Sequence, residues 1–337
     1  IKKDEENNEE IPNALIKKKI QSKTPRQKLI EHDVIFLLLQ GLNKCRENSD
    51  VVIKVFDALY ILLLTSFKDQ VIAAKYLKKI VSNRSFQICI EILSTMLKDD
   101  DKTEGRYEKF VAVTGVIIKL ITGEDKYIIF DLIKKDKHIH KNLCIDLLIN
   151  ENYTRFPKAI AGLVAALGAF IAMDTMILND DGEKFEIIQS FSENRGISLL
   201  LKYNKTHMEN EYCTFECFNS LTLLCPNYPR NIIIIEKRNG IKNIIQCLRL
   251  YTEEVLLIEK VYELLFYLST NQKNVAKFGH DKQVLVNLKR VIDMFGNSYT
   301  CDFFILTCRI CEQLAFHTPV SCSVQIYATP DIYIYIS

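Results

Sequence analysis

Apolar residues recur at spacings of three and four positions along the chain from residue 29 to residue 316. This period places apolar side chains on one face of an α-helix, so the pattern predicts helix for nearly all of this segment. Brief polar joints separate paired apolar stretches at residues 32–42 and 50–67, 83–97 and 105–121, 136–149 and 156–170, 194–203 and 211–224, 239–250 and 253–268, and 281–295 and 301–316. The sequence therefore predicts an all-α fold of about six helical units.

A short phrase recurs at the junctions between these units. Leu64, Leu120, Leu224 and Leu268 each close an apolar helix, and a second apolar stretch follows seven or eight residues later. The clearest copy reads YLSTNQKNVAKFG, residues 267–279. The phrase returns at intervals of roughly 40 to 55 residues, which is typical of a helical solenoid. Because one helical pair cannot bury its apolar face alone, we expect the units to stack into one superhelix with a continuous core.

Three segments depart from the regular pattern. Residues 1–28 carry many charges and asparagines and are interpreted as a flexible linker. Residues 179–183 are expected to form an acidic loop that enlarges the third unit. Residues 317–337 have no helical period and end in alternating Ile and Tyr, so we interpret this tail as an artefact of the gene model; a strand-like tail that pairs with another chain is the alternative. Because the chain starts at Ile1 and not at Met, we expect that an upstream segment is missing.

Charge and hydropathy narrow the classes of partner. The 337 residues include 44 basic and 42 acidic side chains, which gives a net charge of +2. Nucleic-acid-binding proteins normally show a much larger basic excess or a clear basic stripe, so we expect no nucleic-acid partner. The longest uncharged run, residues 159–173, is shorter than the ~20 residues that a bilayer span requires. Its Ala and Gly content predicts a buried helix pressed between neighbours.

The cysteine usage is typical of a reducing compartment. The chain has eleven cysteines, an odd number, and most of them lie among apolar neighbours, as Cys89, Cys144 and Cys247 do. In a chain of this length such residues act as small buried side chains and not as a disulfide framework. We therefore expect a cytoplasmic protein, and we interpret the sequons at Asn83, Asn152 and Asn204 as chance occurrences.

Candidate metal ligands are present but incomplete. Cys308 and Cys311, with His317 nearby, supply half of a zinc signature, and no second Cys-x-x-Cys exists. Three further cysteines are candidate ligands that could complete this half site: Cys213, Cys217 and Cys225. Since the first two of these lie one helical turn apart, as packing cysteines often do, we favour packing over metal binding.

Catalytic signatures are missing from the sequence. His138 and His140 diverge by roughly 200° on a helix, and the acidic runs at 99–101 and 180–181 do not continue into a calcium-binding loop. No phosphate-binding glycine loop, His-Glu-x-x-His or Gly-x-Ser-x-Gly occurs. We therefore expect a non-enzymatic protein with no cofactor, no metal and no small-molecule substrate.

The units resemble armadillo repeats, or the related HEAT repeats, over residues 29–316. In the two C-terminal phrases a final helix ends in Leu-Ser or Leu-Cys, and an Asn-containing joint and a short helix follow. Asn-Gly-Ile or its equivalent then opens the next unit. Gly196 and Gly240 fall where armadillo repeats place the glycine between their first and second helices, whereas the upstream units lack this glycine and are divergent.

This resemblance implies a binding surface. In armadillo proteins the third helices line a concave groove that grips an extended peptide or a partner's surface. Aligning the last three units on their final leucines places Asn219, Glu263 and Arg309 at one equivalent position. Glu216 and Lys260 precede the first two by one helical turn and share that face. The resemblance implies that these five side chains contact a partner protein or peptide; solvation of an exposed face is the alternative.

Two functions stay open at this point. The first is a scaffold or adaptor that holds a partner along its concave face. The second is a co-chaperone or assembly factor, in which the repeat domain is the client-holding half of a larger protein, as in families that join tetratricopeptide repeats to armadillo repeats. Upstream helical repeats of 34 residues would favour the second.

Overall fold

The computed structural model describes residues 34–45, 48–63, 85–98, 104–121, 156–181, 186–193, 195–226, 228–279, 281–295 and 302–317. These residues form fourteen helices and no strand, so the predicted all-α class is confirmed for this part of the chain. The predictions for the linker 1–28, for residues 136–149 with their two histidines, and for the tail after residue 317 lie outside the described residues.

Six helices, which we name the closing helices, each end a predicted unit: α3 (Ser49–Leu63), α6 (Glu104–Ile121), α9 (Pro157–Asp181), α12 (Glu211–Leu223), α15 (Val255–Ser269) and α18 (Asp302–His317). The other described helices precede them in the units: α2 (Val34–Lys44), α5 (Ser85–Lys98), α10 (Glu186–Glu193), α11 (Gly196–Thr206), α13 (Pro229–Lys237), α14 (Gly240–Leu250), α16 (Gln272–Gly279) and α17 (Lys282–Phe295). From α10 onward each unit therefore has two preceding helices and one closing helix.

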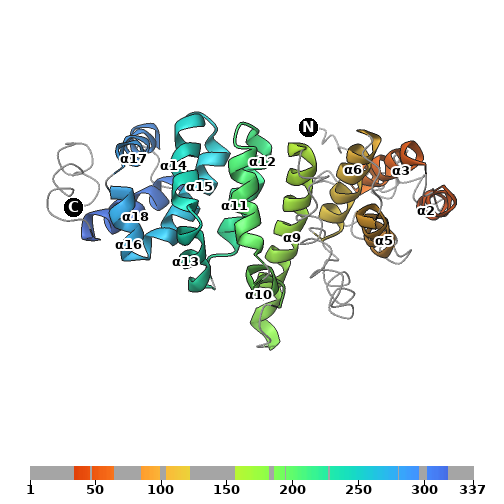
Figure 1. Ribbon diagram of the computed structural model, residues 1–337, viewed down its shortest axis with the longest axis horizontal. Helices are drawn as coiled ribbons and strands as arrows, with labels where there is room; N and C mark the ends of the chain where they lie inside the picture. Colours follow the sequence, from red (N-terminus) through yellow and green to blue (C-terminus); the bar gives the residue numbers. More distant parts are fainter. Residues whose placement is uncertain are drawn as a thin grey trace, which may run out of the picture.

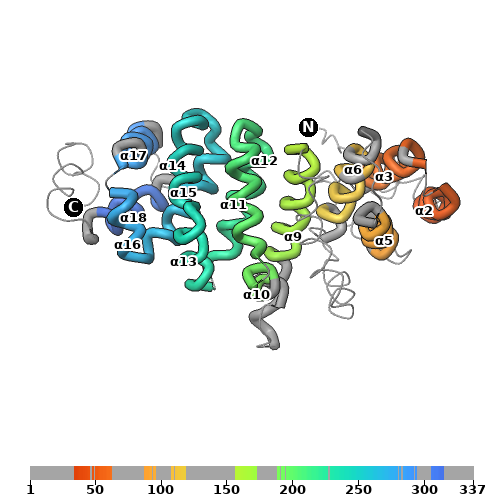
Figure 2. Tube along the Cα trace, viewed as in Figure 1, coloured from red at the N-terminus to blue at the C-terminus, as the bar shows by residue number. Residues whose placement is uncertain are grey.

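Each closing helix packs against the next closing helix along the chain, from α3 through to α18. A second row forms beside them, in which α14 contacts both α11 and α17. The result is an elongated stack in which the order of helices in space follows their order in the sequence (Figures 1 and 2). One apolar cluster of buried side chains runs through this stack from Ile35 to Leu314.

Glycine opens the second helix in two successive units. Arg195 and Asn239, the residues just before these helices, have φ of 66° and 64°, in the left-handed region. Gly196 and Gly240 follow and are buried. A Cβ on Gly196 would overlap the ring of Phe191, and one on Gly240 would lie 2.9 Å from the carbonyl oxygen of Ile235. The predicted glycine positions between short and middle helices are thus confirmed, and a steric reason for them is the close approach of the preceding helix.

Buried asparagines join each of the last two units to the unit before it. The Nδ2 atom of Asn231, in α13, donates to the carbonyl oxygen of Leu224 at 2.7 Å. Likewise, the Nδ2 atom of Asn274, in α16, donates to the carbonyl oxygen of Leu268 at 3.0 Å. Both acceptors stand at the C-terminal end of a closing helix, where carbonyl groups have no partner within the helix. We call these two bonds the asparagine ties.

A second pair of asparagines joins the middle helices. Asn243 in α14 donates to the carbonyl oxygen of Leu201 in α11 at 3.0 Å. Asn287 in α17 donates to the carbonyl oxygen of Leu248 in α14 at 3.2 Å. The two donors are 44 positions apart, as are Gly196 and Gly240, so one hydrogen-bonding role recurs at one position of successive units.

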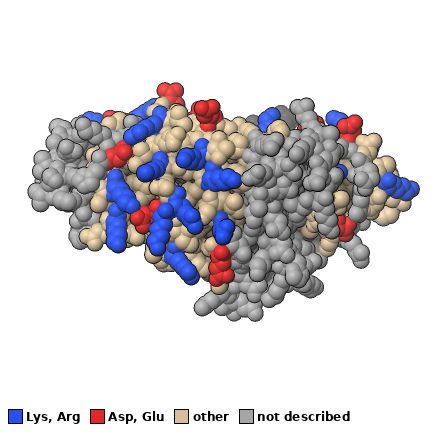
Figure 3. All heavy atoms as spheres, viewed as in Figure 1, with Lys and Arg blue, Asp and Glu red and all other residues tan. Residues whose placement is uncertain are grey.

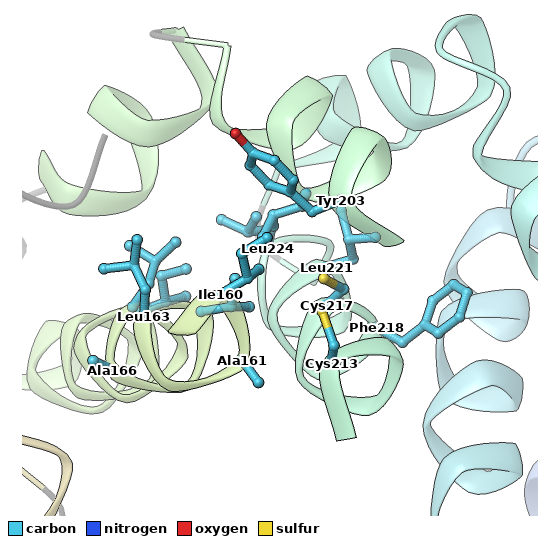
Figure 4. Close-up of a cluster of buried hydrophobic side chains, with 14 of the residues drawn as sticks. Ile160, Ala161, Leu163, Ala166, Tyr203, Cys213, Cys217, Phe218, Leu221 and Leu224 are labelled. Carbon is cyan, nitrogen blue, oxygen red and sulfur yellow. The ribbon is translucent and has the colours of Figure 1, made fainter. Parts of the chain in front are cut away.

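The closing helices approach each other closely where one of them has a glycine. A Cβ on Gly162 of α9 would lie 2.7 Å from Oγ1 of Thr114 in α6, and one on Gly168 would lie 3.0 Å from Oγ of Ser220 in α12. The same Ser220 hydroxyl donates to the carbonyl oxygen of Val164 at 3.1 Å. Helix α9 is therefore buried between α6 and α12 as predicted. Figure 4 shows Ile160 of α9 beside Leu224 at the end of α12. Among the described helices, none has the length and apolar content needed to cross a membrane.

One boundary differs from the prediction. Helix α9 continues to Asp181, so the first three residues of the expected loop 179–183 are helical. Helix-compatible apolar residues precede them in the sequence, and no glycine or proline interrupts the segment between Gly168 and Gly182. Charge alone does not end a helix, because Asn and Asp have only moderately unfavourable helix propensities.

The glycine packing predicts opposite effects of two alanine substitutions. Gly240→Ala places a methyl group against the Ile235 carbonyl and 3.3 Å from Leu201 Cδ2, so it should lower the free energy of unfolding by about 1–3 kcal/mol. Gly41→Ala, in α2, adds a Cβ with no neighbour within 4 Å and should raise it by about 0.5–1 kcal/mol. Urea denaturation followed by circular dichroism measures both. Equal midpoints for the two variants would contradict the packing described here.

Candidate functional site: the exposed stripe of the closing helices

The α12 part of the predicted site is only partly accessible. Asn219 is half-buried, whereas Glu216, one turn earlier, is 8% exposed. A hydrogen bond joins the two side chains, so they share a face as predicted. Burial raises the pKa of Glu216 to about 7, and the bond with Asn219 opposes this rise. A carboxyl group with this pKa changes its charge near neutral pH, which an exposed glutamate does not do.

The α15 part of the predicted site is an ion pair. Nζ of Lys260 lies 2.8 Å from Oε2 of Glu263, and the two side chains are 30% and 33% exposed. The two charges largely cancel, so neither residue is a lone charge on this surface. The backbone beneath them is tied to α12, because the Thr222 hydroxyl donates to the carbonyl oxygen of Lys260 at 3.3 Å.

The α18 part contributes an available cation. Arg309 is exposed, and no carboxylate of the described residues pairs with its guanidinium. Ile305, one turn earlier, is 40% exposed. The structure thus brings the five predicted residues into two side-chain pairs and one unpaired arginine, on three closing helices that pack in order.

Most apolar residues of this surface were not among the predicted site residues. Tyr212 is 56% exposed, and Leu223 is half-buried on α12. Phe215, whose spacing to Asn219 the sequence already shows, is half-buried one turn before it. On α15, Tyr267 is half-buried one turn after Glu263. The signal for them was available, since these residues recur at three- and four-residue spacing around the polar positions. We name the exposed and half-buried residues of α12, α15 and α18 the closing-helix stripe.

The environment of Tyr212 on this stripe shifts its titration. Burial raises the pKa of Tyr212, and the negative charge of Glu216, one helical turn later, raises it further.

The described cysteines are suited to packing. Cys213 and Cys217 are buried one turn apart on α12, on the side facing the core in Figure 4. A hydrogen bond with Cys213, together with burial, raises the pKa of Cys217, and burial raises the pKa of Cys225, Cys247 and Cys311 to about 12. Such thiols stay protonated at neutral pH, and protonated thiols are poor nucleophiles and metal ligands. Among the described residues, no three His, Cys, Asp or Glu side chains come together as a metal site would require.

The sequon at Asn204 is inaccessible in the folded chain. Its side chain is fully buried in α11. A glycosyl acceptor must lie on the surface, so this observation agrees with a chance occurrence. Asn83 and Asn152 lie outside the described residues.

Comparison with known proteins gives no assignment: no family model, no curated protein and no solved structure matches this chain.

The buried carboxyl group predicts a pH-dependent stability. Between its usual pKa of 4.5 and its folded value of about 7, Glu216 holds a proton that the unfolded chain has lost. The free energy of unfolding should therefore fall as pH rises through this window, by about 1–3 kcal/mol. Glu216→Gln removes this loss, so the variant should gain stability relative to the wild type between pH 5 and pH 8.

Urea denaturation at the two pH values measures the effect. Glu312→Gln, at an exposed position of α18, is the control for the loss of one negative charge. A stability difference between Glu216→Gln and the wild type that is the same at pH 5 and pH 8 would contradict the assignment.

Proposed function

We propose that this protein is a non-enzymatic scaffold of the armadillo or HEAT type, which binds an extended segment of a partner protein along the closing-helix stripe. The observation that carries the proposal is the continuous row of closing helices, each packed on the next, with both polar and apolar side chains on its exposed stripe. The recurrence of the glycine turns and the asparagine ties in successive units supports a repeat origin for this row.

The side chains of the stripe suit an extended peptide. A peptide backbone needs both hydrogen-bond donors and acceptors, and the Asn219 amide can supply both in addition to its bond with Glu216. The exposed guanidinium of Arg309 suits a carboxylate. Tyr212 and Phe215 offer apolar area next to these polar groups. This mixture is typical of protein-binding surfaces, in which tyrosine, phenylalanine and arginine are enriched.

Two further features support the proposal. The row is stiffened by side-chain bonds between its helices, so the scaffold would lose little conformational entropy when a partner binds. Six of the eight described cysteines are buried, which suits the cytoplasmic location that we propose.

Peptide selection tests this proposal directly. Peptides selected from a displayed random library against the chain should lose at least tenfold in affinity with Asn219→Ala and with Arg309→Glu, about 1.4 kcal/mol each. Gln246→Ala on α14 and Lys44→Glu on α2 are the matched controls, because both residues are exposed and lie outside the stripe. Fluorescence polarisation measures the Kd values. Peptides that bind the stripe variants and the wild type equally well would overturn the proposal.

A further inference from the structure

A second surface, on different helices, carries an excess of positive charge. Figure 3 shows Lys and Arg side chains gathered on one face over α11, α13, α14 and α16. We define the basic face by six cations, five on α13, α14 and α16 and one on the residue that follows α13: Arg230, Lys237, Arg238, Lys242, Lys273 and Lys277. All six are exposed.

Three of these cations, Lys237, Lys273 and Lys277, lie near one carboxylate. Among the residues of α13, α14 and α16, Glu236 is the one acidic side chain. Its Oε1 atom lies 2.6 Å from Nζ of Lys277. The hydrogen bond from Lys277 lowers the pKa of Glu236, and the charges of Lys273 and Lys237 lower it further. Three lysines from two units are therefore close enough to act on one carboxylate.

Most of the positive charge remains uncompensated. Lys277 is neutralised by Glu236, but no carboxylate of the described residues pairs with Arg230, Lys237, Arg238, Lys242 or Lys273. Arg230 and Lys273 also hold the same place in their units, each one residue before the asparagine of a tie. Although the net charge of the chain is only +2, five cations of this face thus have no ion-pair partner among the described residues. Such a local field attracts and orients an anionic partner.

The apolar content of the face favours one class of anion. Ile233 is 42% exposed and lies between Arg230 and Lys237 on the same side of α13. In the described parts of α13, α14 and α16, no aromatic side chain is among the exposed large hydrophobic residues. Single-stranded nucleic acids are bound largely by stacking on aromatic rings, which this face does not provide. An aliphatic residue between cations suits an acidic peptide that also carries an aliphatic side chain.

We propose that the basic face binds an acidic segment of a partner protein, whose carboxylates pair with Arg230, Lys237 and Lys273 and whose aliphatic side chain covers Ile233. This surface shares no residue with the closing-helix stripe. The two proposals can therefore succeed or fail separately.

The binding of labelled synthetic probes tests the proposal. The first probe is a short peptide of Glu and Asp with central leucines, and the second has serine in place of each leucine. We expect the leucine peptide to bind at low salt, at least three times more tightly than the serine peptide. We expect the affinity for the leucine peptide to fall at least tenfold in the triple variant Arg230→Glu/Lys237→Glu/Lys273→Glu. In the Ile233→Ser variant, the leucine and serine peptides should bind with equal affinity.

Matched variants show whether the binding is specific to the basic face. Charge reversal of Lys44, Lys54 and Lys158, which are exposed on α2, α3 and α9, should leave the affinity unchanged. Asn219→Ala should also leave it unchanged, since it tests the stripe. Circular dichroism checks the fold, and the milder Arg230→Gln/Lys237→Gln/Lys273→Gln repeats the test if the reversal variant does not fold.

Two outcomes would overturn the proposal. The first is equal binding of the leucine peptide to the wild type and to the folded variants of the basic face. The second is tighter binding of a single-stranded oligouridine probe than of the leucine peptide, lost with the same substitutions, which would assign the face to nucleic acid.

Discussion

The asparagine ties are the interaction on which the stacking of the C-terminal units depends. The carbonyl oxygens of Leu224 and Leu268 lie at the buried C-terminal ends of α12 and α15, and a buried carbonyl oxygen left without a partner costs about 1–3 kcal/mol. The Asn231 amide supplies the partner of Leu224 from the first helix of the next unit. The Asn274 amide adds a hydrogen bond to Leu268, whose carbonyl oxygen also accepts from the backbone N–H of Asn271 at 3.2 Å. Each tie thus satisfies the end of one unit with a side chain of the following one, and so fixes where the following unit starts. Glycine then allows the chain to turn closely into the second helix.

Local patterns predicted the all-α class and the positions of the described helices, because helix periodicity is a local signal. Apolar periodicity gave the helices, and Gly196 and Gly240 marked the turns correctly because only glycine fits so close to the preceding helix. The length of α9 was missed because acidic residues after Leu178 resemble a loop in sequence but are tolerated in a helix. Nothing local revealed that Asn231 and Asn274 are buried donors, since their acceptors are set by packing between units.

At the candidate site, too, the sequence predicted what depends on helix spacing but not what depends on packing between helices. Spacing correctly placed Glu216 and Asn219 on one face, since residues one turn apart share a face in any helix. It could not show that Glu216 is buried, because burial depends on how α12 sits among its neighbours. The pair of Lys260 and Glu263, three positions apart, was open to prediction from sequence alone. The basic face could not be predicted from the net charge of the chain, which is nearly balanced. Only the fold brings the cations of α13, α14 and α16 onto one face.

Hydrogen exchange of Asn274→Ala, followed by mass spectrometry, tests most directly whether the ties couple neighbouring units. Exchange should rise in α15 and α16, which the tie joins, and in the adjacent α17, while α2 and α3 at the far end should keep the protection of the wild type. Gln272→Ala is the matched control, since this residue is exposed at the start of α16 and is not part of a tie. A variant whose exchange is unchanged throughout, or raised equally in all units, would contradict the account.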